Sequence, residues 1–121
     1  MSSPENTLEI LSAELLAFAR ERDWEQFHSP KNLAMSLAIE AAELMEHFQW
    51  LDGAQSRALP PAKHEAAALE MADVLIYLIR LSQVLGVDLE AAVRRKMAIN
   101  AGRYPVAASR GKSLKYDELG D

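Results

Sequence analysis

The sequence contains no cysteine and no long hydrophobic run. The absence of cysteine excludes disulfides, zinc-thiolate sites, iron-sulfur clusters and thiol nucleophiles within these residues, and it agrees with a reducing compartment. No apolar stretch is long enough to span a bilayer, and the first residues lack the basic and apolar regions of a secretory signal. We therefore expect a soluble cytoplasmic protein without a membrane partner.

The chain also has little basic charge. Thirteen lysines and arginines stand against eighteen aspartates and glutamates, which gives a net charge of -5. Such a surface repels polyanions, so we expect no nucleic-acid partner. With 121 residues, half of them hydrophobic, the chain is suited to one globular domain. We predict a single domain over residues 1–121, in which residues 105–121 form a flexible tail.

Apolar residues recur at spacings of three and four, and no segment shows the alternation typical of strands. Four helices are predicted, covering about residues 5–22, 30–52, 66–85 and 89–100. The second and third helices, joined by a polar linker with two prolines, should form a central antiparallel pair. From Gly102 onward no period persists, which predicts an extended arm. The fold class is therefore all-α, a four-helix bundle with a C-terminal arm.

Residues typical of helix ends support these bounds. Ser3 and Ser29 each precede a proline, which is the pattern of an N-cap followed by a first-turn proline. Gly86 is placed to end the third helix, and Asp88 can cap the fourth. Surplus apolar residues remain on the outer faces of the central helices, so we expect a homodimer or homotetramer to cover them.

Four acidic side chains lie where apolar residues are expected. On a helical wheel measured from Leu33 in the apolar stripe, Glu40 lies about 20° away, and Glu43 lies about 80° to the same side. In the third helix Glu70 lies within about 20° of its stripe, and Asp73 lies about 60° to one side. Two neighbouring helices would thus point two acid pairs at one space.

Carboxylates in an apolar stripe need a partner, because an isolated buried charge is costly. A divalent cation would relieve the repulsion among four acids, and an all-oxygen donor set favours Mg²⁺ first and Mn²⁺ next. The alternative is that the acids face solvent or form salt bridges with Arg80, Arg94, Arg95 or Lys96. The coincidence of two acid pairs in two stripes favours the metal.

Aromatic side chains flank the acidic helix. Trp24 and His28 precede it, and Trp50 lies near its predicted end. Rings of this kind are usually packing residues, but together they can form the flat slot that a nucleobase requires.

Polar and basic side chains follow in the fourth helix. Lys96 and Asn100 share the face that should point inward, and Arg103 and Tyr104 come directly after them. Carboxylates, a metal and inward cations are suited to polyphosphate chemistry. No glycine-rich phosphate loop is present, which excludes a P-loop NTPase.

Four sequence blocks carry a family resemblance. They are RDWEQFHSPKNL (22–33), EAAELMEHFQW (40–50), EMADVLIYLIRL (70–81) and KMAINAGRYPVAASRGKSLKY (96–116). In this order they resemble the MazG-like superfamily of all-α nucleoside triphosphate pyrophosphohydrolases, and in particular its dCTP pyrophosphatase branch.

The resemblance implies an enzyme that cleaves the α-β phosphoanhydride of dCTP, or of a related or modified deoxynucleotide, to the monophosphate and pyrophosphate with Mg²⁺. It also implies a dimer or tetramer. The acids Glu40, Glu43, Glu70 and Asp73 would hold the metal and act in catalysis. Substrate would contact Trp24, His28, Trp50, Tyr77, Lys96, Asn100, Arg103 and Tyr104.

One position departs from the branch. Leu15 stands where relatives in the dCTP branch carry a histidine near the base, so the base preference stays open. Two other functions remain as alternatives. One is a non-enzymatic helical protein-interaction module, and the other is a phosphatase for a different polyphosphate.

Overall fold

The computed structural model describes residues 6–120, and all regular structure in this part of the chain is helical. The α-helices are α1 (Thr7–Glu21), α2 (Pro30–Glu46), α3 (Gly53–Ser56), α4 (Pro61–Leu85), α5 (Leu89–Arg103) and α6 (Val106–Ser109). Two 3₁₀ turns are present, η1 (Glu25–Phe27) and η2 (Tyr116–Glu118). The predicted all-α class is confirmed. Among the described residues, no helix combines the length and the hydropathy that crossing a membrane requires.

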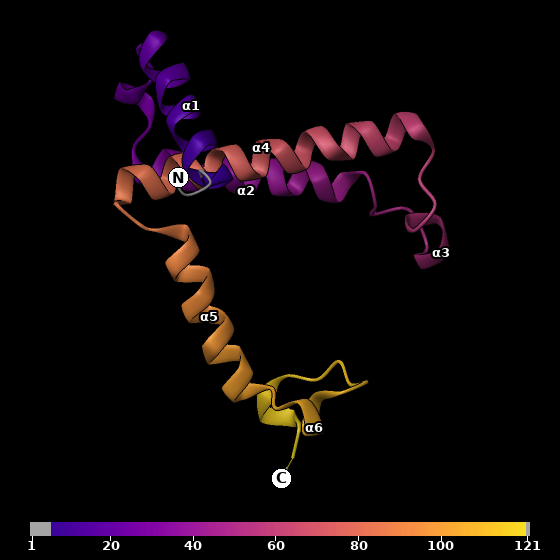
Figure 1. Cartoon of the computed structure of the whole chain (residues 1–121). Helices are drawn as coiled ribbons and strands as arrows, with labels where there is room; N and C mark the ends of the chain where they lie inside the picture. The colour runs from indigo at the N-terminus through magenta and orange to yellow at the C-terminus, as the bar shows by residue number, and fades with distance from the viewer. Residues whose placement is uncertain (1–5, 121) are drawn as a thin grey trace, which may run out of the picture. The chain divides into compact units, whose positions relative to one another are not determined.

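The chain falls into two units, Met1–Gly86 and Val87–Asp121, and each is described by itself. In the first unit α2 and α4 lie side by side and antiparallel, as predicted, and α1 packs against α4 (Figure 1). Leu33 of α2 and Ile79 of α4 are the largest fully buried side chains. Ala19 and Ala67 are buried with them, because small side chains let helices approach closely.

The helix ends follow the local sequence. The side chains of Ser29 and Asp88 accept hydrogen bonds from backbone N–H groups three residues further on, at 3.2 and 3.0 Å. Gly86 ends α4 with a left-handed φ of 68°, a conformation that glycine adopts without steric cost. Asn6 caps α1, whereas the predicted start at Ser3 lies outside the described residues.

Two predicted bounds differ from the structure. Helix α2 ends at Glu46, earlier than expected, because the next residues continue in tighter turns such as the 2.9 Å bond from the N–H of Phe48 to the carbonyl of Met45. The linker contains the short helix α3, whose capping box joins Asp52 and Gln55. Helix α4 begins at Pro61, earlier than the predicted start at residue 66, because proline is a favoured first helical residue.

The second unit consists of α5, α6 and η2. Short helical turns interrupt the predicted extended arm, and each is too short to give a periodic signal in the sequence. The ring of Tyr116 in η2 contacts two residues at the end of α5. The Tyr104 ring lies edge-on at 6.2 Å between centroids, and the Arg103 guanidinium lies 4.8 Å from the Tyr116 centroid.

Candidate active site

Three of the four predicted acids meet between α2 and α4. Glu40 and Glu43 lie one turn apart on α2, and Glu70 reaches them from α4. Each offers a carboxylate oxygen, and these three oxygens lie within 4.8 Å of one another. The antiparallel packing of the two helices therefore converts two separate sequence motifs into one acidic group. Asp73, the fourth predicted ligand, is not part of this group.

The acidic group is electrostatically strained in the absence of a cation. The Oε2 atoms of Glu40 and Glu70 are buried and have no hydrogen-bond partner among the described residues. The pKa of Glu40 is raised to about 7, mainly by burial, and the neighbouring carboxyl groups of Glu43 and Glu70 and the charge of Asp73 act in the same direction. Like charges held this close require either a proton or a metal ion.

Within residues 6–120, no salt bridge neutralises these acids. Between described residues, side-chain ion pairs join Arg20 to Glu25, Arg22 to Glu21 and Arg94 to Glu90. None of these pairs includes the four predicted acids, so the salt-bridge alternative lacks support. Buried carboxylate oxygens without a cationic partner are suited to a hard divalent ion such as Mg²⁺ or Mn²⁺.

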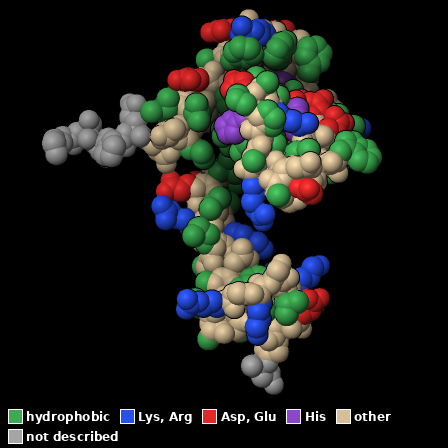
Figure 2. Space-filling view, turned by 90° about the vertical axis from the view of Figure 1, so that its right-hand side faces the viewer, with side chains coloured by type: hydrophobic (Ala, Val, Ile, Leu, Met, Phe, Trp, Pro, Cys, Tyr) green, Lys and Arg blue, Asp and Glu red, His purple; other side chains and the backbone are tan. Residues whose placement is uncertain are grey.

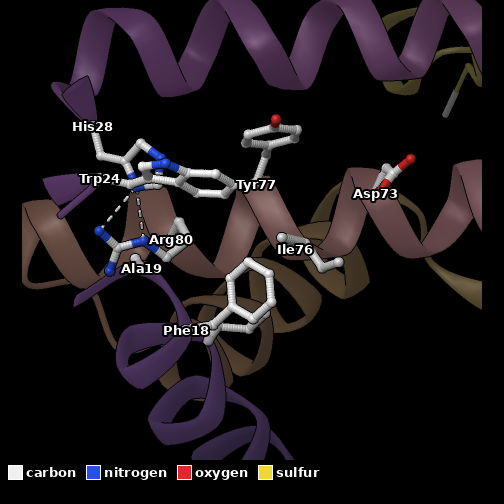
Figure 3. Close-up of a pocket in the computed structure, with 9 residues that line it drawn as sticks. Phe18, Ala19, Trp24, His28, Asp73, Ile76, Tyr77 and Arg80 are labelled. Carbon is white, nitrogen blue, oxygen red and sulfur yellow. Dashed lines mark hydrogen bonds between the residues drawn. The ribbon is translucent and has the colours of Figure 1, made fainter. Parts of the chain in front are cut away.

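A cavity of about 350 Å³ lies between α1, the segment around η1, and α4. Aromatic side chains form part of its wall. The rings of Phe18 and Trp24 meet edge-on at 5.8 Å, and His28 follows at 6.4 Å from Trp24. Figure 3 shows Tyr77 on the α4 side of the same space. The full lining is Leu15, Phe18, Ala19, Trp24, His28, Asp73, Ile76, Tyr77 and Arg80.

Asp73 connects the cavity with the acidic group. Its side chain lines the cavity, and its charge contributes to the raised pKa of Glu40. An apolar pocket with a few polar groups, next to a cluster of carboxylates, matches what a small charged ligand with a flat ring requires. The position of Leu15, singled out from the sequence as bearing on base preference, also lines this cavity.

Arg80 is a lining residue that the sequence did not indicate. Its side chain is buried, and its Nε and Nη2 atoms lie 3.2 and 3.1 Å from Nδ1 of His28 (Figure 3). Its Nη1 donates to the side-chain oxygen of Gln83. The available signal was a single cation inside the apolar run DVLIYLIRL. Phe18 was also missed, because it fits the apolar stripe of its helix.

The remaining predicted substrate residues lie elsewhere. Trp50 follows α2 and is 87 % exposed, and it does not line this cavity. Lys96 and Asn100 lie on α5, Arg103 is its last residue, and Tyr104 is its C-cap. All four belong to the second unit, and their contact with substrate stays a prediction.

Comparison with known proteins places this arrangement in a family. Residues 35–119 match the MazG-like family, and the chain belongs to it. Among its relatives, dCTP pyrophosphatase 1 of Mus musculus is 48% identical over 119 residues, which are 97% of this chain and 70% of the mouse protein. The Homo sapiens protein of the same name has the same identity and coverage.

Two further relatives extend the comparison. The dATP/dGTP diphosphohydrolase of Cyanophage S-2L is 49% identical over 43 residues, which cover 36% of this chain and 41% of that protein. The crystal structure of a pyrophosphatase from Archaeoglobus fulgidus DSM 4304 superposes with a TM-score of 0.81 and 38% identity, and the match covers 87% of this chain and 98% of the other. The resemblance inferred from the four sequence blocks is thus confirmed.

Proposed function

We propose that this protein hydrolyses a deoxynucleoside triphosphate to the monophosphate and pyrophosphate, with dCTP or a modified relative as its substrate. The observation that carries the proposal is the group of Glu40, Glu43 and Glu70 next to an aromatic cavity. Within this group the buried Oε2 atoms of Glu40 and Glu70 have no hydrogen-bond partner among the described residues. Membership of the MazG-like family and 48% identity to dCTP pyrophosphatase 1 support the same reaction.

A divalent metal ion fits the acidic group. We propose Mg²⁺, with Mn²⁺ as a substitute, held by Glu40, Glu43, Glu70 and Asp73. Such an ion, when bound, neutralises phosphate charge and stabilises the charge that develops during phosphoryl transfer. Without it, the acidic group would repel a polyphosphate.

The residues of the chain itself would bind substrate and activate water. Phe18, Trp24 and Tyr77 offer flat walls for a nucleobase, and His28 adds a polar contact. One carboxylate of the acidic group orients or deprotonates the attacking water. The water oxygen bonds to one phosphorus of the α-β linkage, the bond from that phosphorus to the bridging oxygen breaks, and the water proton passes to the carboxylate.

The decisive experiment is product analysis with a panel of nucleotides. The purified chain is incubated with Mg²⁺ and each common or cytosine-modified deoxynucleoside triphosphate, and products are separated by ion-exchange chromatography. We expect monophosphate and pyrophosphate in equal amounts, and no reaction with excess chelator. Diphosphate and free phosphate as products, or undiminished activity with chelator, would contradict the proposal.

Two isosteric substitutions test the acids. Glu40→Gln and Asp73→Asn should each abolish pyrophosphate release while the helical content is kept, because each removes a proposed metal ligand without changing side-chain size. Glu65→Gln, an exposed position on α4, is the matched control and should keep full activity. Activity retained in both site variants would remove Glu40 and Asp73 from the mechanism.

We also propose that the protein works as a homodimer or homotetramer. Met35, Ile39 and Met45 of α2 and Leu69 and Met71 of α4 are each more than half exposed. Figure 2 shows apolar side chains exposed among charged ones on the face that it presents. A second copy would cover such residues. Light scattering coupled to size exclusion should give two or four times the monomer mass, and a monomer at micromolar concentration would contradict this proposal.

The non-enzymatic alternative is tested with the same material. A thermal-shift screen with nucleotides, with and without Mg²⁺, should show stabilisation that needs both components. A pure interaction module would show none.

Residues 1–121 are proposed to act as one pyrophosphohydrolase domain, and Ala substitutions of Lys96, Asn100 and Arg103 should raise KM if these residues contact substrate.

A further inference from the structure

Arg80 is a buried cation without an acidic partner among the described ion pairs. Arg80 is only 4% exposed, and it donates hydrogen bonds to neutral acceptors, the ring of His28 and the amide oxygen of Gln83. A buried charge that lacks a carboxylate is costly, and burial lowers the pKa of Arg80 accordingly. An apolar side chain would fill this position at a lower free-energy cost, so the presence of arginine indicates that its contacts have a function.

The contact between Arg80 and His28 defines where the imidazole proton lies. A guanidinium group only donates hydrogen bonds. Because Nε and Nη2 of Arg80 both face Nδ1 of His28, Nδ1 must be the unprotonated acceptor. The proton of the neutral ring is therefore on Nε2, which has no hydrogen-bond partner among the described residues.

Arg80 is itself held by a chain of directed hydrogen bonds. The amide nitrogen of Gln83 donates to the backbone carbonyl and to the hydroxyl oxygen of Ser12 on α1. This fixes the orientation of the Gln83 amide, so that its oxygen faces Nη1 of Arg80. The guanidinium is thus held between α1 and the η1 segment. Because its N–H donors have fixed directions, they also fix the orientation of the His28 ring.

We infer that Arg80 is a positioning residue that keeps Nε2–H of His28 as a hydrogen-bond donor for an acceptor atom of the nucleotide in the aromatic cavity. His28 and Arg80 line that cavity together with Trp24 and Tyr77 (Figure 3). A carbonyl oxygen or an unprotonated ring nitrogen of the base is the acceptor this donor selects. The inference rests on the proposed function, because it takes the cavity as the nucleotide site.

The charges around His28 favour its neutral form. From α4 the facing groups are Arg80, Tyr77 and Asp73, from η1 Glu25, and from α1 Arg20. Burial and then the charge of Arg80 lower the pKa of His28, and Glu25 opposes them. Glu25 is engaged with Arg20 at 2.9 Å. The ring therefore stays neutral at physiological pH, and its donor and acceptor nitrogens stay distinct.

The first test reads the imidazole directly and needs no substitution. Long-range proton-nitrogen NMR correlation spectra of the full wild-type chain distinguish the two tautomers, and His28→Gln assigns the signal among the three histidines. We expect His28 to be protonated on Nε2 and to titrate below the ordinary histidine pKa of about 6.5. A ring protonated on Nδ1, or one charged at pH 7, would overturn the inference whether or not the protein hydrolyses nucleotides.

The second test asks whether Arg80 acts through His28. Arg80→Met removes the donors but keeps an unbranched side chain, and we expect a rise in KM of roughly three- to tenfold with little change in kcat, as for the loss of one hydrogen bond. His28→Ala should raise KM similarly. The double variant should be no worse than His28→Ala, because the two residues contribute one shared interaction.

Controls separate this role from a purely structural one. Lys31→Met removes an exposed cation near the same segment, at the start of α2, that is not among the charged groups facing His28, and its KM should equal that of the wild type. Arg80→Met should unfold within a few degrees of the wild type, since a buried unpaired cation adds little stability. Additive effects in the double variant, or an unchanged KM for a folded Arg80→Met protein, would refute the positioning role while leaving the hydrolysis itself intact.

Discussion

Replacing Glu70 by glutamine should stabilise the metal-free protein while abolishing its activity. Carboxylate oxygens of Glu40, Glu43 and Glu70 lie within 4.8 Å of one another. Two full charges at that separation repel by about 1 kcal/mol in water and by about 3.5 kcal/mol at an effective dielectric constant of about 20. The amide of the variant removes this repulsion and can also donate a hydrogen bond to the unpartnered Oε2 of Glu40.

We therefore expect the free energy of unfolding of Glu70→Gln to rise by about 1 to 3 kcal/mol at pH 8 with excess chelator. This corresponds to an increase in Tm of roughly 3 to 10 °C for a chain of this size. At pH 8 Glu40, whose pKa is about 7, is mostly ionised, so the repulsion is near its maximum.

The assay is thermal unfolding followed by circular dichroism, with and without Mg²⁺. Added Mg²⁺ should raise the Tm of the wild type and leave that of Glu70→Gln almost unchanged, because a ligand of the ion has been lost. Glu65→Gln, an exposed position on the same helix, is the control and should behave as the wild type. A metal-free Glu70→Gln protein that is less stable than the wild type would refute the idea that the acids repel one another.

Three further perturbations probe the fold and the pocket. Leu33→Ala, at a position only 1% exposed, should lower the free energy of unfolding by about 2 to 4 kcal/mol in urea titration. Gly86→Ala should cost about 1 kcal/mol by the same measurement, because the φ of 68° is unfavourable for a residue with a Cβ. The pKa of His28 is lower in the folded chain than in the unfolded chain, so the unfolded chain is protonated at this residue first as the pH falls. The contribution of His28 to the free energy of unfolding is therefore fully present above its ordinary pKa of about 6.5 and is lost as the pH falls below that value. His28→Gln should remove this part of the pH dependence, and an identical pH profile in the variant would contradict the assignment.

Local patterns in the sequence predicted much of the fold. Apolar spacing located the helices, and the caps at Ser29 and Asp88 and the stop at Gly86 are present in the structure. These features depend on residues within one or two turns of each other, so the sequence alone contains them. The early end of α2 and the short helix α3 were missed, because single turns give no periodic signal.

The acids illustrate what the sequence could and could not predict about the site. The helical-wheel positions of Glu40 and Glu70 lie in apolar stripes, which predicted that the two side chains point into one space between the helices. The alternative that they form salt bridges to arginines stayed open. Only the packing of α2 against α4 decided between them, because distances across helices depend on register and crossing. The structure joins Glu40, Glu43 and Glu70 and leaves Asp73 on the wall of the neighbouring cavity.

Arg80 shows most clearly which features of the site the sequence alone could not predict. In the sequence it is one cation in an apolar run, and its partners His28 and Ser12 lie on segments distant along the chain. Periodicity reports which face of a helix is buried, and it carries no information about which side chain of another segment meets that face. Residues close to one another along the chain specified the helices, the acidic pairs and the family resemblance. Packing between distant segments specified which side chains share the cavity and which nitrogen of His28 faces Arg80.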